Sequence, residues 1–314
     1  MARCNSGRLF QRRNQRLSVS VIPAVAFIVY SSFQGAVQAW VQGHAGSPTS
    51  QRPALGREIY VARRSEASAS EGAETFADKK EALKKCLARE YTSFFRPFEQ
   101  AFYTEGVTFK DPLNQLEGKD KYRMNVEMLS GENLVGTFLF KDGFINLHSV
   151  EDIPGDEYAL RTRWTLGFTF KLLPWQPEAV FTGVSEYTID ADAKVVSQRD
   201  YWDTLSLDRG GEYRPEEGLA GLVDLNAQLL LPKTDGKPTG WELLRRTYNY
   251  EVYRVSSTGK VFAVSAKKNQ LDQRAIASAI ERHGLKAGSP CSQDGYAAVE
   301  VESPHPWEGS LPDF

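Results

Sequence analysis

The chain has few of the residues that build disulfide frameworks and metal clusters. Closely spaced cysteines and histidines are what structural zinc sites and small disulfide-rich domains require. This chain has three cysteines and four histidines, all widely spaced and without a C-x-x-C pair. They are Cys4, Cys86, Cys291, His44, His148, His283 and His305. We therefore expect neither a disulfide framework nor a metal site.

The chain also lacks an excess of either charge. Lysine and arginine total 38 and aspartate and glutamate total 40, which gives a formal net charge of −2 at pH 7. Proteins whose main partner is nucleic acid or an acidic membrane surface usually carry a strongly basic face. The composition therefore argues against both partners. A length of 314 residues is typical of one or two domains with appendages.

Only the N-terminus contains a sustained apolar run. Several arginines precede the apolar residues 17–33, and Val37-Gln-Ala39 supplies small residues at the spacing that a signal peptidase reads. This pattern predicts a secretory signal peptide over residues 1–39. The alternative is a signal anchor or a single transmembrane helix, but Pro23 and a serine-rich flank shorten the run below the roughly 20 apolar residues that a spanning helix needs. We expect no stable transmembrane segment in the mature protein.

Residues 40–75 have a different bias. From Trp40 to Ser65 the only acid is Glu58, against four arginines and many hydroxyl residues. Such composition is typical of an organelle transit peptide. A signal peptide followed by this segment resembles the bipartite leaders of proteins sent to secondary plastids in algae, which implies a plastid (chloroplast) address. The alternative is a disordered linker on a secreted protein.

The stretch from Tyr158 to Phe170 alternates strictly between two kinds of residue. Tyr158 and every second residue after it fall on one face, which is largely apolar, while Arg161, Arg163, Thr165, Thr169 and Lys171 fall on the other. Period-two alternation predicts a half-buried antiparallel strand. A turn at Pro174–Pro177 and two more strands, the second ending in residues 199–203, are expected to follow.

The preceding segment predicts helices and short strands. Aromatic and aliphatic residues recur every three or four positions over residues 77–98, which predicts an amphipathic helix. A strand over 102–109, a turn at 110–114 and a second helix through Tyr122, Val126 and Leu129 to Gly131 follow. Strands are then expected at 137–140 and 146–150. Together these elements predict an α+β cone, in which a curved antiparallel sheet wraps around helices.

Several motifs in this region resemble a known family. They are Tyr103-Thr-Glu-Gly-Val-Thr-Phe-Lys-Asp-Pro112 with Gly118, Leu173-Pro-Trp-Gln-Pro177, Gly183-Val-Ser185 and Asp200-Tyr-Trp-Asp203. In order and spacing they resemble an uncharacterised family of plant and algal plastid proteins with the nuclear-transport-factor-2-like (SnoaL-like) fold. We place this cone domain at residues 76–208. The resemblance implies an apolar cavity, which related cones use for small hydrophobic ligands, for acid/base chemistry, or for dimerisation only.

If the cone is catalytic, an inward carboxylate is the expected base, because burial disfavours its charged form and brings its pKa toward neutrality. The catalytic candidates are Asp111, Asp200 and Tyr187. Asp111 precedes Pro112 and is also an ordinary turn former. Asp200 and Asp203 lie on opposite faces of a regular strand, so only one of them points inward unless the strand bulges. The expected ligand-pocket residues are Tyr103, Phe109, Trp164, Phe168, Tyr187 and Trp202.

Other polar residues in this region have two interpretations each. Tyr201, like Tyr103 and Tyr187, could donate a phenolic hydroxyl. Arg161 and Arg163 share a strand face, where they would bind an anionic group or a partner's carboxylates, or simply form the solvated side of the strand. His148 is expected at a strand end rather than as a catalytic base.

Residues 209–240 contain turn-rich stretches around a short helical run at 219–231 and are expected to be a linker. A strand at 241–254 and a second at 260–265 follow. Tyr250-Glu-Val-Tyr-Arg254, the segment 276–285 and Ser303-Pro-His-Pro-Trp307 resemble parts of the SOUL haem-binding family. The chain departs from that family between Ala266 and Asp272, where there is almost no room for the middle strands and helix.

We therefore read residues 241–314 as a shortened SOUL-like segment. The resemblance makes His283 and His305 candidate axial ligands of a haem, although His283 before Gly284 also fits a helix C-terminus. The pairing of both resemblances implies a plastid binding protein, without enzymatic activity, for a tetrapyrrole (haem or porphyrin) or another small hydrophobic ligand. The alternatives are a dimerisation or scaffold module that uses the sheet face, and a hydrolase, lyase or isomerase with an inward aspartate as general base.

Overall fold

A computed structural model describes residues 74–230, 237–267 and 270–302. The predicted signal peptide, nearly all of the predicted transit segment, His305 and the motif at 303–307 lie outside these residues. No helix within the three described ranges is long and apolar enough to cross a membrane.

The described residues form two sheets with their helices. We call the first sheet and its helices the cone; its elements are α2 (Phe76–Thr92), a 3-10 turn (Gln100–Phe102), β1 (Tyr103–Lys110), β2 (Gln115–Glu117), α3 (Lys119–Leu129), α4 (Leu134–Leu139), β3 (Phe140–Ile153), β4 (Asp156–Phe170), β5 (Glu178–Ile189), β6 (Val195–Trp202), a 3-10 turn (Arg209–Gly211) and α5 (Leu219–Leu230). We call the second the tail; its elements are β7 (Trp241–Arg246), β8 (Tyr250–Val255), β9 (Val261–Ser265), α6 (Gln273–Arg282), β10 (Lys286–Gln293) and β11 (Tyr296–Glu302).

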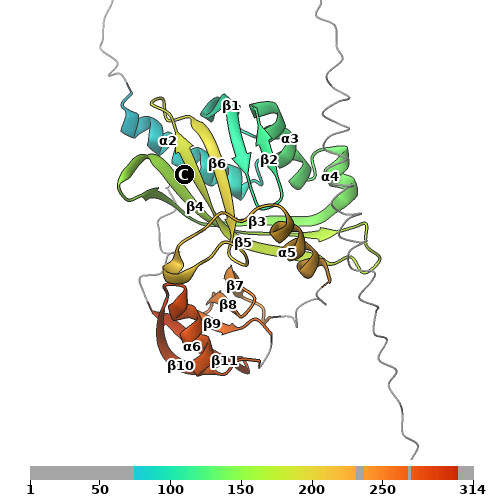
Figure 1. Ribbon diagram of the computed structural model, residues 1–314, viewed down its shortest axis with the longest axis vertical. Coiled ribbons are helices and arrows are strands. Elements are labelled where there is room, and N and C mark those ends of the chain that lie inside the picture. Colours follow the sequence, from blue (N-terminus) through green and yellow to red (C-terminus); the bar gives the residue numbers. More distant parts are fainter. Residues whose placement is uncertain (1–73, 231–236, 268–269, 303–314) are drawn as a thin grey trace, which may run out of the picture. The chain divides into compact units, whose positions relative to one another are not determined.

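The cone sheet has six strands in the order β2-β1-β6-β5-β4-β3. Helix α2 packs against β3 and helix α3 against β1 (Figure 1). The α+β class is confirmed. The expectation of an antiparallel sheet is wrong for one pair, because β1 runs parallel to β6 while the other neighbours are antiparallel.

Helix α2 begins as its sequence predicts and ends earlier. Thr75 and Asp78 form a capping box at its N-terminus, and Leu83, Leu87 and Tyr91 form its buried stripe. The predicted end near residue 98 is wrong, because Phe94 and Phe95, just after the helix, have φ values of 56° and 61°. A right-handed helix cannot continue through such positive φ values.

The expected strand at 137–140 is also wrong. Leu134–Leu139 form the short helix α4, and the backbone N–H of Gly136 donates to the Asn133 side chain at 2.8 Å, which caps its first turn. Strand β3 begins only at Phe140 and includes the strand expected at 146–150. The cap therefore stabilises a helix where a strand was expected.

The long strand β4 is buried on both faces over most of its length, so the expectation of a half-buried strand is wrong. Trp164 on the inner face is 3% exposed, but Arg163 and Thr165 on the outer face are only 3% and 1% exposed. The tail covers them. The Thr165 hydroxyl donates to the Leu243 carbonyl at 2.7 Å, and the Arg163 guanidinium donates to the Leu244 carbonyl at 2.8 Å.

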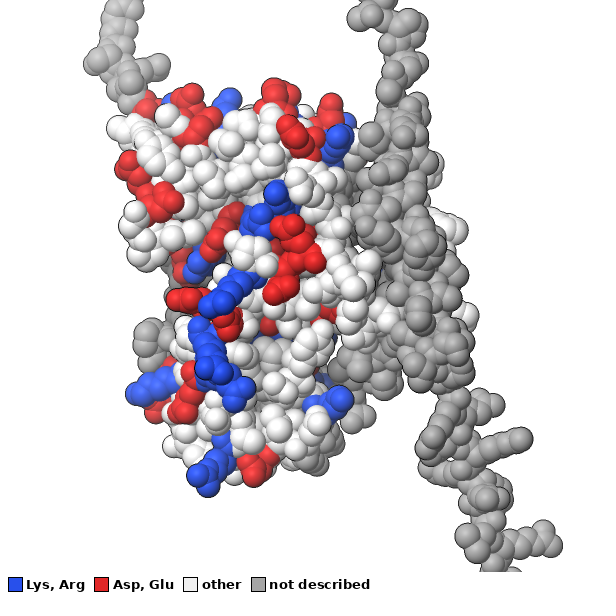
Figure 2. Space-filling view, viewed as in Figure 1, with Lys and Arg blue, Asp and Glu red and all other residues white. Residues whose placement is uncertain are grey.

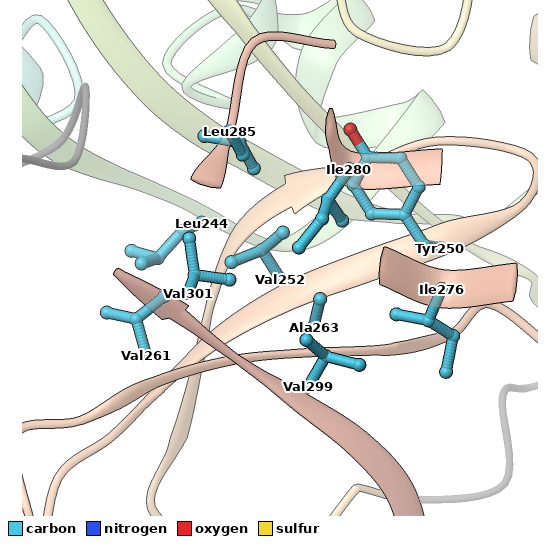
Figure 3. Close-up of a cluster of buried hydrophobic side chains, with 10 residues drawn as sticks. All are labelled: Leu244, Tyr250, Val252, Val261, Ala263, Ile276, Ile280, Leu285, Val299 and Val301. Atoms are coloured by element: carbon cyan, nitrogen blue, oxygen red, sulfur yellow. The ribbon is translucent and has the colours of Figure 1, made fainter. Parts of the chain in front are cut away.

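The tail is a five-stranded antiparallel sheet in the order β10-β11-β9-β8-β7. The strand expected over 241–254 is a hairpin, β7 and β8, which turns at Thr247. Strands β10 and β11 were not expected from the sequence. Figure 3 shows Val252, Ala263 and Val299 of the sheet facing Ile276 and Ile280 of α6. The tail therefore has a hydrophobic core of its own.

Helix α5 confirms the helical run expected at 219–231 and packs against the cone. The Trp175 indole N–H donates to the Leu229 carbonyl at 3.0 Å, and the Val180 backbone N–H donates to the Gln228 side chain at 3.1 Å. This part of the expected linker thus belongs structurally to the cone. On the face viewed in Figure 2, acidic and basic side chains are intermingled, as the near-zero net charge suggests.

Candidate functional site

The cone encloses a partly open cavity of about 50 Å³ between its helices and the inner face of its sheet. Most of the wall is aromatic or aliphatic, and the polar groups gather at one side. The lining residues are Tyr91, Phe94, Phe95, Phe109, Tyr122, Asn125, Val126, Leu129, Ile145, Trp164, Leu166, Gln198 and Asp200. A concave, mainly apolar site with a few polar groups is the usual form of a small-molecule site.

Asp200 is the one carboxylate among these lining residues. It lies near the end of β6 with its side chain directed inward. The Ser185 hydroxyl donates to Asp200 Oδ1 at 2.6 Å, and the Gln198 amide donates to the same oxygen at 2.8 Å. Among the described residues, both donors reach Oδ1 and hold that oxygen in place, whereas Oδ2 receives neither of these bonds.

Both donors to Asp200 are themselves oriented by neighbours. The Trp164 indole N–H, which can only donate, reaches the Ser185 hydroxyl oxygen at 2.9 Å. The Tyr122 hydroxyl donates to the Gln198 carbonyl oxygen, so the Gln198 NH₂ group faces Asp200. These contacts fix the direction in which both donors point.

Tyr91 extends this network away from the cavity. Its hydroxyl is 2.9 Å from the Ser185 hydroxyl and 2.8 Å from the Tyr187 hydroxyl. The Thr162 hydroxyl donates to it at 3.2 Å. Tyr187 therefore supports the site from behind and is not one of the lining residues.

The pKa of Asp200 is raised from 3.8 to about 7, and desolvation by burial is the largest cause. The hydrogen bonds from Ser185 and Gln198 oppose the rise, because they stabilise the carboxylate form. Neither of these two hydrogen-bond donors to Asp200 is a cation. Both protonation states of Asp200 are therefore populated near neutral pH.

A second carboxyl group is buried in the cone outside the cavity lining. Glu90 on α2 is 1% exposed, and it accepts hydrogen bonds from the Tyr103 hydroxyl at 2.6 Å and the Glu99 backbone N–H at 2.7 Å. Burial raises its pKa from 4.5 to about 7. Tyr103, expected in the pocket, thus serves as the partner of Glu90.

The structure places the other catalytic candidate, Asp111, in a turn and not in the cavity wall. Its carboxylate accepts hydrogen bonds from the backbone N–H groups of Leu113 at 2.7 Å and Asn114 at 2.5 Å. Desolvation raises its pKa from 3.8 to about 6, although these bonds favour the charged form. The geometry is that of an aspartate-initiated turn.

The expected pocket residues fall into separate groups. Phe109 and Trp164 line the cavity. Phe168 and Trp202 instead pack on either side of Phe181, with ring centroids 5.9 Å and 4.4 Å away. Residue 183 must be glycine, because a Cβ there would lie 2.1 Å from the Tyr201 carbonyl oxygen of the neighbouring strand and 3.0 Å from the Trp164 ring. The inner face of the sheet therefore carries two aromatic groups, and only the first borders the cavity.

On the outer face, Asp203 forms a buried ion pair. The Arg163 guanidinium contacts both carboxylate oxygens of Asp203, one of them at 2.8 Å, and the Tyr213 hydroxyl donates to Asp203 at 2.6 Å. The pKa of Asp203 is lowered: desolvation opposes this, but the charge of Arg163 and the hydrogen bonds outweigh it. Tyr201 also faces outward, with its ring 5.8 Å from that of Tyr213. Arg161, in contrast, pairs with Glu186 near the surface.

The two histidines among the described residues hold structural positions. His148 lies within β3, not at its end, and its Nε2 is 2.8 Å from the Thr165 hydroxyl. His283 caps the C-terminus of α6, as its place before a glycine predicts, and its Nδ1 is 2.9 Å from the hydroxyl of the buried Tyr250. Within the described ranges, no three His, Cys, Asp or Glu side chains are grouped to hold a metal ion.

The residues that the structure describes do not fit a haem. No histidine lines the cone cavity, whose volume is about 50 Å³. One nitrogen of His283 is hydrogen-bonded to Tyr250, and its ring packs on that tyrosine with 5.6 Å between centroids.

Sequence reasoning missed Tyr91, Tyr122, Asn125 and Gln198. The two tyrosines occupy core positions of amphipathic helices, which periodicity cannot distinguish from cavity positions. Gln198 was findable, because it and Asp200 are two residues apart on one strand and therefore share a face. The signal in the sequence is that the two polar residues Gln198 and Asp200 share the inner face of the strand with Trp202.

Residues 81–198 are similar to the family described as "Uncharacterized conserved protein (DUF2358)". This match lies within the cone and ends two residues before Asp200. No curated protein matches the chain in sequence.

Several solved structures are similar to about two fifths of the chain. The epoxide hydrolase/cyclase-like enzyme SalBIII, which has a role in pyran ring formation in polyether salinomycin, is 17% identical, with 41% of this chain and 94% of that one covered and a TM-score of 0.32. An NTF2-like protein of unknown function from Exiguobacterium sp. 255-15 is 16% identical, with 41% and 98% covered and a TM-score of 0.27. An LEH-like epoxide hydrolase from M. tuberculosis is 11% identical, with 40% and 82% covered and a TM-score of 0.30. None of these likenesses assigns an activity to the chain.

Proposed function

We propose that the cone binds a small, uncharged organic molecule and that Asp200 exchanges a proton with it. The observation that carries this proposal is the placement of Asp200. Its carboxyl group borders an otherwise largely apolar cavity, two oriented donors hold one of its oxygens, and burial brings its pKa to about 7. A general acid or base works best when its pKa lies near the working pH.

The arrangement favours two classes of reaction. With Oδ1 held by Ser185 and Gln198, Oδ2 is the atom that would take a proton from a C–H next to a carbonyl, or from a water molecule. The first reaction is typical of isomerases and lyases, and the second of hydrolases. Asn125 in the wall would orient the polar group of the substrate, while the aromatic lining limits the water that competes for it.

Pure binding is the second candidate for the same cavity. Protonated Asp200 would donate a hydrogen bond to a ligand's carbonyl or ether oxygen without any reaction. A tetrapyrrole is the least favoured ligand, because of the cavity volume of about 50 Å³. Homodimerisation through the sheet face is disfavoured at its middle, where the tail covers Arg163 and Thr165.

We also propose that the protein is sent to a plastid, and the support for this comes from residues 1–75 alone. A fluorescent protein fused behind these residues and expressed in an alga with secondary plastids tests it. We expect plastid fluorescence, whereas secretion to the medium would favour the linker interpretation.

The test of the cavity combines a pKa measurement with binding of a small neutral ketone. In the mature chain with ¹³C-labelled aspartate, the carboxyl signal that disappears in Asp200→Asn should titrate with a pKa of about 7. Cyclopentanone should bind at least about fivefold more tightly at pH 5.5 than at pH 8.5, because only protonated Asp200 donates to its carbonyl oxygen.

Asp111→Asn is the matched control, since Asp111 also has a raised pKa but lies in a turn outside the lining. It should keep the pH dependence of ketone binding, and Asp200→Asn should abolish it. An Asp200 pKa near 4, or no saturable binding at either pH, would refute the proposal.

A further inference from the structure

Three aromatic side chains cluster in the tail, and two of them lie against a lysine ammonium. Trp241, Tyr253 and Tyr296 come from β7, β8 and β11, and the Trp241 ring lies 5.3 Å from Tyr253 and 5.6 Å from Tyr296 between centroids. The Lys237 Nζ lies 4.4 Å from the centroid of Tyr296 and 5.5 Å from that of Tyr253. Both distances are within the range of cation–π attraction.

A carboxylate completes the surroundings of this ammonium. Glu251 Oε2 lies 3.4 Å from Lys237 Nζ and accepts a hydrogen bond from the Tyr253 hydroxyl at 2.7 Å. Glu251 is 2% exposed, and its second oxygen accepts a hydrogen bond from Arg246 Nε at 2.8 Å. The one carboxylate of Glu251 therefore faces two cations, Arg246 at one oxygen and Lys237 at the other, and the aromatic rings supply the remaining attraction for the lysine ammonium.

The two aromatic residues that face Lys237 are held rigidly. Tyr253 and Tyr296 are 4% and 6% exposed and belong to a packed cluster on the face of the tail sheet opposite α6. The Trp241 indole N–H donates to Asp294 Oδ2 at 3.0 Å, which fixes the third ring. Rigid aromatic walls lose little entropy when a cation enters.

The lysine is not part of the sheet that forms the walls. Lys237 precedes β7 and reaches the rings from the segment before it, and its side chain is only 12% exposed. Lysine side chains usually keep their charged end in water. Lys237 is an exception, because its ammonium is held between aromatic rings and an acid.

We propose that Trp241, Tyr253, Tyr296 and Glu251 form a binding site for an alkylammonium group, which Lys237 of the same chain fills in this structure. The chemical class is a compact organic cation such as choline, or the methylated ammonium of a lysine side chain. Aromatic rings with an acid recognise such cations through cation–π attraction and charge. The site lies in the tail and does not depend on the cone cavity.

The test frees the site by substitution and compares a cation with its neutral analogue. Lys237→Gln in the mature chain should bind choline at least about tenfold more tightly than the unsubstituted chain in a calorimetric titration. It should bind choline at least about tenfold more tightly than 3,3-dimethylbutan-1-ol, which has the same shape but no charge. Tyr296→Leu added to Lys237→Gln should abolish the preference for choline.

Lys237→Met is the second variant, because it keeps an unbranched side chain and removes only the charge. Equal affinity for choline and the alcohol in both variants would overturn the proposal, as would choline binding that survives Tyr296→Leu. Loss of the folded state in both Lys237 variants, seen by circular dichroism, would also overturn it, since Lys237 would then be an indispensable part of the core.

Discussion

Asp200 and Asp203 stand three residues apart at the end of β6 and face opposite sides of one sheet. The pKa of Asp200 is raised to about 7, and that of Asp203 is lowered. Desolvation raises the pKa of both, so burial does not distinguish them. Their partners distinguish them. Asp200 accepts hydrogen bonds from a hydroxyl and an amide, whereas Asp203 forms an ion pair with a guanidinium.

The comparison separates two uses of a buried carboxyl group. On the outer face, the permanent charge of Asp203 joins the cone to the tail through Arg163, which also donates to the Leu244 carbonyl. On the inner face, the neutral partners of Asp200 leave its proton free to come and go near pH 7. A structural carboxylate needs a cationic partner, as Asp203 has, and an acid or base needs neutral partners, as Asp200 has.

The largest effect is expected on the outer face. Arg163→Met removes the guanidinium that contacts both oxygens of the buried Asp203, and breaking a buried ion pair in this way costs about 3–5 kcal/mol. Urea unfolding of the mature chain measures the loss. The double variant Arg163→Met, Asp203→Asn removes both charges and should be more stable than the single one. A single variant within about 1 kcal/mol of the parent would contradict the assigned role.

A smaller and pH-dependent effect is expected on the inner face. Because the pKa of Asp200 is about 7 in the folded chain against an ordinary 3.8, the unfolded chain releases this proton first as pH rises. Folding stability therefore falls between about pH 4 and pH 7, by up to about 4 kcal/mol.

Asp200→Asn removes this penalty. Its unfolding free energy should approach that of the parent near pH 3.5 and exceed it at pH 8, in urea titrations at each pH. Part of the slope should remain, since Glu90 also has a pKa raised to about 7. A difference between the two proteins that stays constant with pH would show that Asp200 does not titrate as described.

The smallest effect is expected at Arg161. It shares the outer face of β4 with Arg163, but it lies where the tail does not cover that face. Its side chain is 40% exposed and pairs with Glu186, which is 29% exposed. Exposed pairs contribute about 0.2–1 kcal/mol, so Glu186→Gln should lower the unfolding free energy by less than about 1 kcal/mol. A loss as large as that of Arg163→Met would mean that the tail is not what distinguishes the two arginines.

Only part of this comparison could be predicted from the sequence. Alternation along β4 and β6 places Trp164 inward and puts Asp200 and Asp203 on opposite faces, but it does not say which aspartate points inward. The same alternation made Arg163 and Thr165 look solvated. Their burial depends on carbonyl groups of β7, about eighty residues later in the chain, and a local pattern contains no information about such a contact.

The tail shows a second limit of local patterns. The segment Lys286–Gln293 contains glycine, proline and serine and reads as a loop, yet it forms the edge strand β10. Edge strands tolerate proline and polar residues because one side pairs with no neighbour. The cavity tyrosines were hidden for a different reason, since Tyr91 and Tyr122 have the spacing of ordinary core residues.

The parallel pairing of β1 with β6 also determines when the cavity can exist. Phe109 lies beside Gln198 in that pairing, although they are about ninety residues apart in the chain. During synthesis, β1 must therefore wait for nearly the whole cone to be made before its neighbour arrives. The strand with which β1 pairs is the same strand that carries Asp200, so the cavity wall and the carboxyl group that borders it depend on one long-range pairing.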